Sequence, residues 1–256
     1  MSTYRFVALG DSFTEGMVDV GLDGEYRGWA DRLAGHLSRT FATEGITLDY
    51  ANLAVRGRLM SEIAADQLPR ALDLHPDLVS FVAGGNDLLR PGADPDALAV
   101  TLEESVVALS AAGVRVLLAT GCDRGRTPLL RYHRSAVAIL NSHVWGIAAR
   151  HGCLVLDLWN IPELRARRSW DEDRIHLSPE GHEQVAVTAL RVLGHPRPEN
   201  APDAREPLPV QSATPRLATN LHWTRTYLLP WVGRRLRRTS SGAGRVAKRP
   251  EPLPLD

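Results

Sequence analysis

The sequence predicts a doubly wound α/β fold built on a parallel sheet. Five short apolar runs rich in branched residues are typical of strands buried on both faces, and segments with helical spacing lie between them. This alternation implies parallel strands joined by right-handed crossovers. Polar residues and glycines follow several of these runs directly, at the sheet edge where such folds carry their sites. The expected strands are Arg5–Leu9, Leu48–Leu53, Leu78–Ala83, Val114–Thr120 and Leu154–Leu158.

Four helices are predicted from apolar residues that recur at helical spacing. The last of them begins at Ser178-Pro179-Glu180, because serine is a good N-cap and proline suits the first helical position. The apolar positions are Trp29, Leu33 and Leu37 in the first helix, Leu98, Leu102, Val106 and Leu109 in the second, Leu130, Val137, Leu140, Val144 and Ile147 in the third, and Val185, Ala189 and Val192 in the last.

Composition and charge are those of an ordinary globular protein. The chain has 256 residues, 44% of them hydrophobic and 23% charged, which suffices for a sizeable core. The N-terminus carries no charged-then-apolar export signal, and no apolar run approaches the roughly 18 residues of a membrane span. Cys122 and Cys153 are expected at opposite edges of the sheet, so they should not pair. A cytoplasmic protein is therefore expected.

Ser12 is the first candidate for chemistry, because it follows the first expected strand in Gly10-Asp11-Ser12. At that place a serine can present its hydroxyl as a nucleophile and its backbone N–H to the same site. A serine in a turn, bound to nearby backbone, is the alternative for a lone motif of this kind. Asp11 is expected to brace the loop through its carboxylate.

His176 is the candidate base, with Asp173 as the carboxylate that orients it. Asp173 lies three residues earlier, in the loop before the last helix, and can fold back onto the far ring nitrogen. The alternative is a surface aspartate and a capping histidine. His182, inside the predicted helix and without a carboxylate at that spacing, is the competing base and is expected to be structural. Asp157, at the end of the fifth strand, is the competing acid and is expected to anchor the loop that follows.

An acyl-transfer site also needs donors where negative charge develops, each worth about 10²–10³ in rate. Gly57 has no side chain, so its backbone N–H can approach a reacting oxygen closely. Asn86 follows two glycines, whose lack of side chains leaves room for its amide to reach the same oxygen. Glycines after strands are usually only turns, so each motif is weak alone. No dinucleotide or phosphate-loop motif is present, and no histidines have metal-ligand spacing.

Taken in order, Gly10-Asp11-Ser12, Gly57, Gly85-Asn86-Asp87 and Asp173-x-x-His176 resemble the four blocks of the SGNH (GDSL-type) hydrolase superfamily, over about residues 4–193. The resemblance implies a three-layer α/β/α sandwich with a five-stranded parallel sheet of flavodoxin-like order 2-1-3-4-5. It implies Ser12 as nucleophile, His176 as base and Asp173 as its orienter. An oxyanion hole would be formed by the Ser12 and Gly57 N–H groups and the Asn86 side chain, with Asp11 and Asp87 in support. No metal or organic cofactor is expected.

The division into domains follows from a change in amino-acid composition at Pro196. Residues 1–195 are expected to form the catalytic domain, and residues 196–256 a Pro-rich linker and a basic, aromatic C-terminal extension. The extension contains eleven Lys or Arg and five Asp or Glu, a net charge of +6, so residues 1–195 carry −6. These opposite charges favour docking of the extension across the catalytic domain. Attachment to an anionic membrane, contact of Arg234–Arg238 with nucleic acid, and partial disorder are the alternatives.

The resulting functional hypothesis is a serine hydrolase that cleaves a small-molecule carboxylic ester through an acyl-enzyme on Ser12. An O-acetyl sugar deacetylase, and a lysophospholipid or thioester hydrolase, are variants of the same class. A non-catalytic binding module of the same fold is the alternative from another class. No nucleic-acid partner is expected, peripheral membrane contact through the extension is possible, and the oligomeric state is left open.

Overall fold

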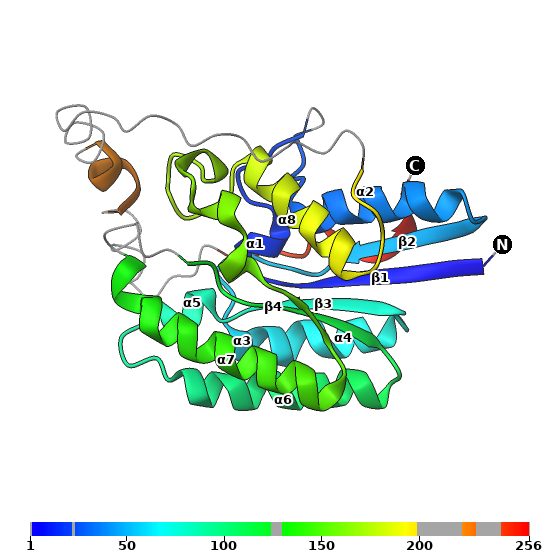
Figure 1. Cartoon of the computed structure of the whole chain (residues 1–256), viewed down its shortest axis with the longest axis horizontal. Helices are drawn as coiled ribbons and strands as arrows, with labels where there is room; N and C mark the ends of the chain where they lie inside the picture. The colour runs from blue at the N-terminus through cyan, green and yellow to red at the C-terminus, as the bar shows by residue number, and fades with distance from the viewer. Residues whose placement is uncertain (1, 22–23, 124–129, 199–221, 229–241, 256) are drawn as a thin grey trace.

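A six-stranded sheet lies at the centre of the molecule, with helices on both faces (Figure 1). The computed structural model describes residues 2–21, 24–123, 130–198, 222–228 and 242–255. The strands occur in the order β5-β4-β3-β1-β2-β6 across the sheet. They are β1 (Ser2–Gly10), β2 (Ile46–Asn52), β3 (Leu78–Val82), β4 (Arg115–Ala119), β5 (Leu154–Leu156) and β6 (Arg249–Pro254).

The first five strands are all parallel to their neighbours, so the predicted sheet order 2-1-3-4-5 is confirmed. The predicted number of strands is wrong, because β6 pairs antiparallel with β2 and adds a sixth. Its sequence, Arg-Pro-Glu-Pro-Leu-Pro, does not resemble a strand. Proline cannot donate to a ladder, and it is tolerated here because β6 is an edge strand with one neighbour.

Helices cover the sheet in two layers (Figure 1). On one face lie α2 and α8, and on the other lie α3, α4, α6 and α7. The α-helices are α1 (Ser12–Glu15), α2 (Trp29–Ala42), α3 (Met60–Glu62), α4 (Leu68–Asp73), α5 (Gly85–Leu88), α6 (Pro95–Ala111), α7 (Arg134–His151) and α8 (Pro179–Val192). Short 3₁₀ segments are η2 (Leu130–His133), η3 (Leu158–Asn160), η4 (Pro162–Arg165) and η5 (Arg167–Ser169), and π-helical segments are η1 (Ile63–Gln67) and η6 (Thr224–Leu228).

Each face of the sheet has its own apolar core. Val7 and Leu9 of β1 point into the core beneath α6 and α7, and Phe6 and Ala8 point into the core beneath α2 and α8. All four side chains are fully buried, as the alternation along a strand covered on both faces requires. The expected start of α8 is also confirmed, because the Ser178 hydroxyl accepts the Gly181 N–H at 3.2 Å.

The crossover between β2 and β3 contains a helical stretch, Met60–Asp73, that is not among the four predicted helices. Its buried residues Met60, Ile63, Leu68 and Ala71 recur at helical spacing, so the apolar pattern of a helix is present here. Its middle section, η1, has π-helical hydrogen bonds, and Pro69 follows at the start of α4.

The C-terminal extension is described at residues 222–228 and 242–255, and both parts pack on the α/β core. Ala247 is buried among the core residues on the α6 and α7 face. Arg234–Arg238, considered above as nucleic-acid contacts, lie outside the described residues. The boundary at residue 195 stays a prediction, although β6 belongs to the same sheet as the other strands. Within the described ranges, no helix is both long and apolar enough to cross a membrane. Cys122 and Cys153 are both free thiols.

Candidate active site

The nucleophile candidate lies at the carboxyl end of β1, where the strand turns directly into α1. Asp11 is the N-cap of α1, and its Oδ1 accepts the Phe13 N–H at 3.0 Å. Gln67 of η1 holds the end of the strand, since its amide both donates to and accepts from the backbone of Gly10 at 2.9 Å. A side chain at Gly10 would come within 2.6 Å of the Thr14 hydroxyl, so only glycine fits this turn. Ser12 is thereby fixed at the start of a short helix.

His176 and Asp173 come from the loop before α8 and meet Ser12 across the sheet edge. The Nε2 atom of His176 lies 3.0 Å from Ser12 Oγ, and its Nδ1 atom lies 2.5 Å from Asp173 Oδ2. The other oxygen of Asp173 accepts the N–H groups of Ile175 and His176, at 2.8 and 2.9 Å. Burial opposes ionisation of Asp173, but the hydrogen bond and charge of His176 outweigh it and lower the Asp173 pKa below its usual range. Asp173 is therefore held as a carboxylate facing the imidazole.

The two competing residues lie elsewhere. His182 is 1% exposed, and its Nδ1 accepts the Trp29 N–H at 3.0 Å. Burial and the nearby Arg32 lower the pKa of His182 to about 3, which keeps the ring neutral. Asp157 accepts from the Thr120 hydroxyl at 3.1 Å and from the Asn160 amide at 2.8 Å, so it anchors the ends of β4 and β5. Neither residue contacts Ser12.

The oxyanion-hole candidates come from the loops after β2 and β3. Gly57 has φ +74°, a left-handed conformation that favours glycine. The side-chain amide of Asn86 donates to Asp11 Oδ2 at 2.9 Å and to the Arg58 carbonyl oxygen at 3.1 Å. Asp87 accepts the Met60 N–H at 3.1 Å and so ties the two loops together. The structure thus links Asn86 to the residue before the nucleophile and to the residue after Gly57.

A buried ion pair that the sequence analysis missed holds the Gly57 loop against α1. Glu15, in the last position of α1, accepts the Arg56 backbone N–H at 2.7 Å and the Arg56 Nε at 3.0 Å. The two side chains are 9% and 7% exposed. Arg56 also lies over the Tyr26 ring, 4.8 Å from its centroid. The residues are far apart in sequence, and neither belongs to a motif that could have indicated the pair.

Asp11 is a buried acidic group whose pKa lies above its usual range. Burial raises its pKa to about 6, and the Phe13 N–H and the charge of His176 offset only part of this effect. Its two oxygens accept from Phe13 and from Asn86, one on each side of the nucleophile. The predicted bracing role of Asp11 thus extends to the orientation of Asn86.

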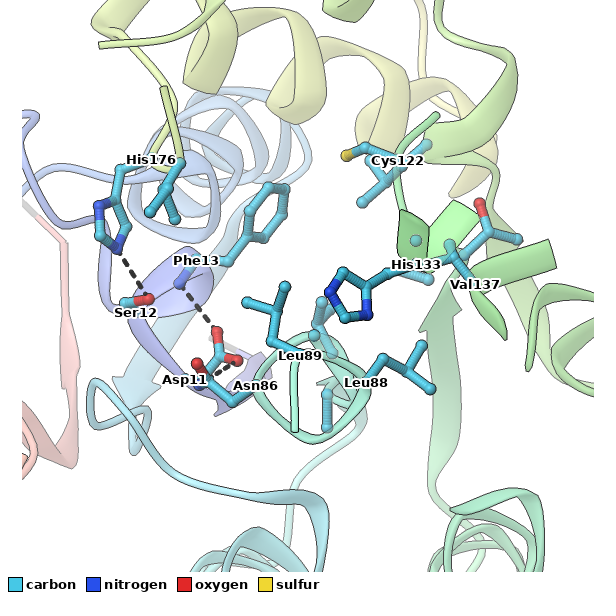
Figure 2. Close-up of a pocket in the computed structure, with 18 of the residues that line it drawn as sticks. Asp11, Ser12, Phe13, Asn86, Leu88, Leu89, Cys122, His133, Val137 and His176 are labelled. Carbon is cyan, nitrogen blue, oxygen red and sulfur yellow. Dashed lines mark hydrogen bonds between the residues drawn. The ribbon is translucent and has the colours of Figure 1, made fainter. Parts of the chain in front are cut away.

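A cavity of about 200 Å³ opens beside Ser12 and His176. Figure 2 shows these two residues on one side, Leu88 and Leu89 in the middle, and Cys122, His133 and Val137 on the opposite side. Its apolar lining comprises Phe13, Val82, Ala83, Leu88, Leu89, Ala119, Val137, Leu158, Trp170 and Ile175. Ser12 and His176 are therefore at one end of a largely apolar space (Figure 2). In the described part of the chain, no three His, Cys, Asp or Glu side chains gather so that they could hold a metal ion.

Solved structures with the same fold include an alpha/beta hydrolase, the protein TesA and an acetylxylan esterase. LAE5, an alpha/beta hydrolase enzyme from the metagenome of Lake Arreo, is 24% identical with a TM-score of 0.62, over 76% of this chain and 97% of its own. TesA is 23% identical with a TM-score of 0.59, over 74% and 97%. Axe2, an acetylxylan esterase from Geobacillus stearothermophilus, is 19% identical with a TM-score of 0.60, over 78% and 98%. At these identities the similarity concerns the fold.

The sequence itself gives the family. No curated protein matches the chain. The family model described as GDSL-like lipase/acylhydrolase matches residues 8–184, more than half of the chain and all four blocks from Ser12 to His176. The chain therefore belongs to the GDSL-like lipase/acylhydrolase family and is an ester-hydrolysing enzyme.

Proposed function

We propose that this enzyme cleaves carboxylic esters through an acyl-enzyme formed on Ser12, with His176 as general base and Asp173 as its orienter. The observation that carries the proposal is the unbroken hydrogen-bonded chain from Ser12 Oγ through both ring nitrogens of His176 to the Asp173 carboxylate. Because Asp173 binds Nδ1, the neutral ring has Nε2 available to take the serine proton.

The reaction then runs in two halves. Ser12 Oγ attacks the ester carbonyl carbon while its proton passes to His176 Nε2, 3.0 Å away. The C–O bond to the alcohol breaks, and His176 returns the proton to the departing alkoxide, which leaves as the alcohol. A water molecule next gives its proton to His176 and attacks the acyl carbon. The bond to Ser12 breaks, His176 returns its proton to the serine oxygen, and the carboxylic acid departs.

Charge on the carbonyl oxygen would be stabilised by the N–H groups of Ser12 and Gly57 and by the Asn86 amide. Asn86 already donates to Asp11 and to the Arg58 carbonyl. The contact with Arg58 is longer, 3.1 Å against 2.9 Å, and its acceptor is uncharged. The incoming oxyanion therefore replaces the Arg58 oxygen, and Asp11 keeps the amide in the orientation that the reaction needs.

The cavity supports an acyl chain longer than acetyl as the preferred substrate. Leu88, Leu89 and Val137 line the space that continues from Ser12, which suits methylene groups better than sugar hydroxyls. Acetylated sugars, the substrate class in the description of Axe2, are the second candidate, with thioesters and lysophospholipids beyond them. The alternative of a non-catalytic binding module does not hold, since the chain belongs to the GDSL-like lipase/acylhydrolase family.

The test is hydrolysis of p-nitrophenyl esters from acetyl to palmitoyl by the wild type and by Ser12→Ala. Turnover that disappears in Ser12→Ala supports the nucleophile, and a fluorophosphonate adduct located by peptide mass spectrometry would identify the modified residue. Full turnover in Ser12→Ala would refute the acyl-enzyme. Loss of turnover in Ser12→Ala, together with a preference of the wild type for the acetyl ester, would favour the deacetylase variant.

A further inference from the structure

The C-terminal extension reaches the loop that carries the general base. Trp223 is 9% exposed, and its indole N–H donates to the Asp173 carbonyl oxygen at 2.7 Å. The guanidinium of Arg174 lies over the same ring, 5.0 Å from its centroid. The residue just before η6 (orange in Figure 1) thus contacts the orienting residue Asp173 and the next residue, Arg174, in the turn that leads to His176.

The loop needs such support because its backbone is unfavourable at Arg174. The φ of Arg174 is +61°, in the left-handed region where residues with a Cβ are disfavoured. Within the loop, Asp173 Oδ1 gathers the N–H groups of Ile175 and His176. The carbonyl oxygen of Asp173 is held separately, by the indole N–H of Trp223.

The far end of the extension is fixed to the opposite side of the site. Lys248, the only lysine in the chain, donates to the Glu15 and Tyr26 carbonyl oxygens at 2.6 and 2.7 Å and to Asp31 Oδ2 at 2.6 Å. A Cβ at Gly242 would lie 2.0 Å from the Arg56 carbonyl oxygen, so the two backbones are in direct contact. The extension is therefore anchored on α1 and the Gly57 loop as well as on the base loop.

We infer that Trp223 is a positioning residue for catalysis: through its hydrogen bond to the Asp173 carbonyl, it holds the Asp173–His176 turn at the distance from Ser12 that proton transfer requires. The inference rests on the proposed function, because it assigns Trp223 an effect that passes through Asp173. A displacement of the turn weakens the contact between Ser12 and His176, which acts in the transition state. Of the turn, only Ile175 and His176 line the cavity, so most of the acyl lining stays in place. Trp223 does not line that cavity. Loss of the Trp223 hydrogen bond should therefore lower kcat and leave KM nearly unchanged.

The experiment compares Trp223→Phe, which keeps a ring beside Arg174 and removes the N–H, with Trp145→Phe as a matched control. Trp145 is 51% exposed on α7. For Trp223→Phe we expect kcat to fall about fivefold, in the range of one hydrogen bond, with KM within about twofold of the wild type. Trp145→Phe should leave both constants unchanged. Thermal unfolding of both variants shows whether the fold is intact.

A double-mutant cycle separates positioning from a general structural role. In an Asp173→Asn background the turn no longer presents a carboxylate to His176, so Trp223→Phe should have little further effect on the residual turnover. The same fivefold loss in both backgrounds, a kcat equal to the wild type, or a change confined to KM would each overturn the inference. Ser12→Ala is assayed beside them: full turnover in that variant would refute the proposed function itself, which is a different result from a silent Trp223→Phe.

Discussion

Replacing Glu15 by glutamine should destabilise the enzyme through an uncompensated charge at Arg56. The carboxylate takes the Arg56 backbone N–H and both Nε and Nη2, and the two side chains are 9% and 7% exposed. Glutamine keeps one oxygen for these donors and turns an NH₂ group toward a cation. Removal of one partner from a buried pair costs about 3–5 kcal/mol. Because one acceptor remains, we expect a loss of about 3 kcal/mol in the free energy of unfolding.

Urea unfolding followed by tryptophan fluorescence measures this loss. With an m value of roughly 2–3 kcal/mol/M, the midpoint should fall by about 1–1.5 M. The matched control is Glu62→Gln, which removes the charge from an exposed pair with Arg58 on the same loop, 3.6 Å apart and 41% and 31% exposed. An exposed pair of this kind contributes below about 0.5 kcal/mol. Glutamine can still accept the Leu59 N–H there, at 2.8 Å in the wild type.

Two outcomes would refute the reasoning. If Glu15→Gln and Glu62→Gln lower the midpoint equally, the pair with Arg56 is solvated and does not hold the loop. Because the pair holds the Gly57 loop against α1, Glu15→Gln should also lower kcat. Full kcat with lost stability would show that the pair stabilises the fold without positioning Gly57. A companion variant, Glu15→Leu with Arg56→Met, replaces both charges by apolar side chains, and it should regain stability without regaining kcat.

Three further predictions test the site. His176→Ala should lose at least about 10³-fold in kcat with the fold intact. His182→Ala should keep most of its turnover and lose about 2–4 kcal/mol of stability, because a buried ring and the partner of the Trp29 N–H are removed. The reverse pattern would exchange the roles of the two histidines. Each methylene added to the acyl chain should raise kcat/KM about fourfold until the cavity is full, since burying it contributes about 0.8 kcal/mol, and a flat or falling series from acetyl to hexanoyl would exclude the cavity as the acyl site. The folded-state pKa of Asp11, about 6, is raised from 3.8, so the folded state holds this proton more tightly and the free energy of unfolding falls as pH rises from about 4 to 7. Asp11→Asn should lose that dependence and gain about 3 kcal/mol relative to the wild type between pH 4 and pH 8; parallel stability curves would contradict it.

The sequence predicted the residues that meet at the candidate site because each one is part of a short local pattern. Gly10-Asp11-Ser12 follows an apolar run, and Asp173 folds onto His176 within one turn. The alternation of strands and helices predicts parallel strands, so the loops that carry these patterns lie at the same edge of the sheet. The competing residues were also assigned correctly to structural contacts, because a histidine inside a helix has no local carboxylate to orient it.

What holds the site together could not be predicted, since its partners are distant in sequence and carry no signature. Glu15 and Arg56 are 41 positions apart, and Lys248 reaches the Glu15 carbonyl across 233 positions. Such pairs depend on how loops from different strands approach each other. The stretch Met60–Asp73 differs, because its buried Met60, Ile63, Leu68 and Ala71 do recur at helical spacing. Only the π-helical hydrogen bonding of Ile63–Gln67 has no signature in that pattern.

The prolines of β6 bear on how separate copies of the protein behave toward one another. An open sheet has two edges at which a strand from another copy could add and begin an aggregate. One edge is β5, which has only three residues. At the other edge, Pro250, Pro252 and Pro254 alternate along β6 and have no N–H to offer an incoming strand. The prolines that make β6 hard to recognise as a strand in the sequence thus also end the sheet at this edge. They prevent the sheet, whose strands are rich in apolar and branched residues, from extending into another molecule.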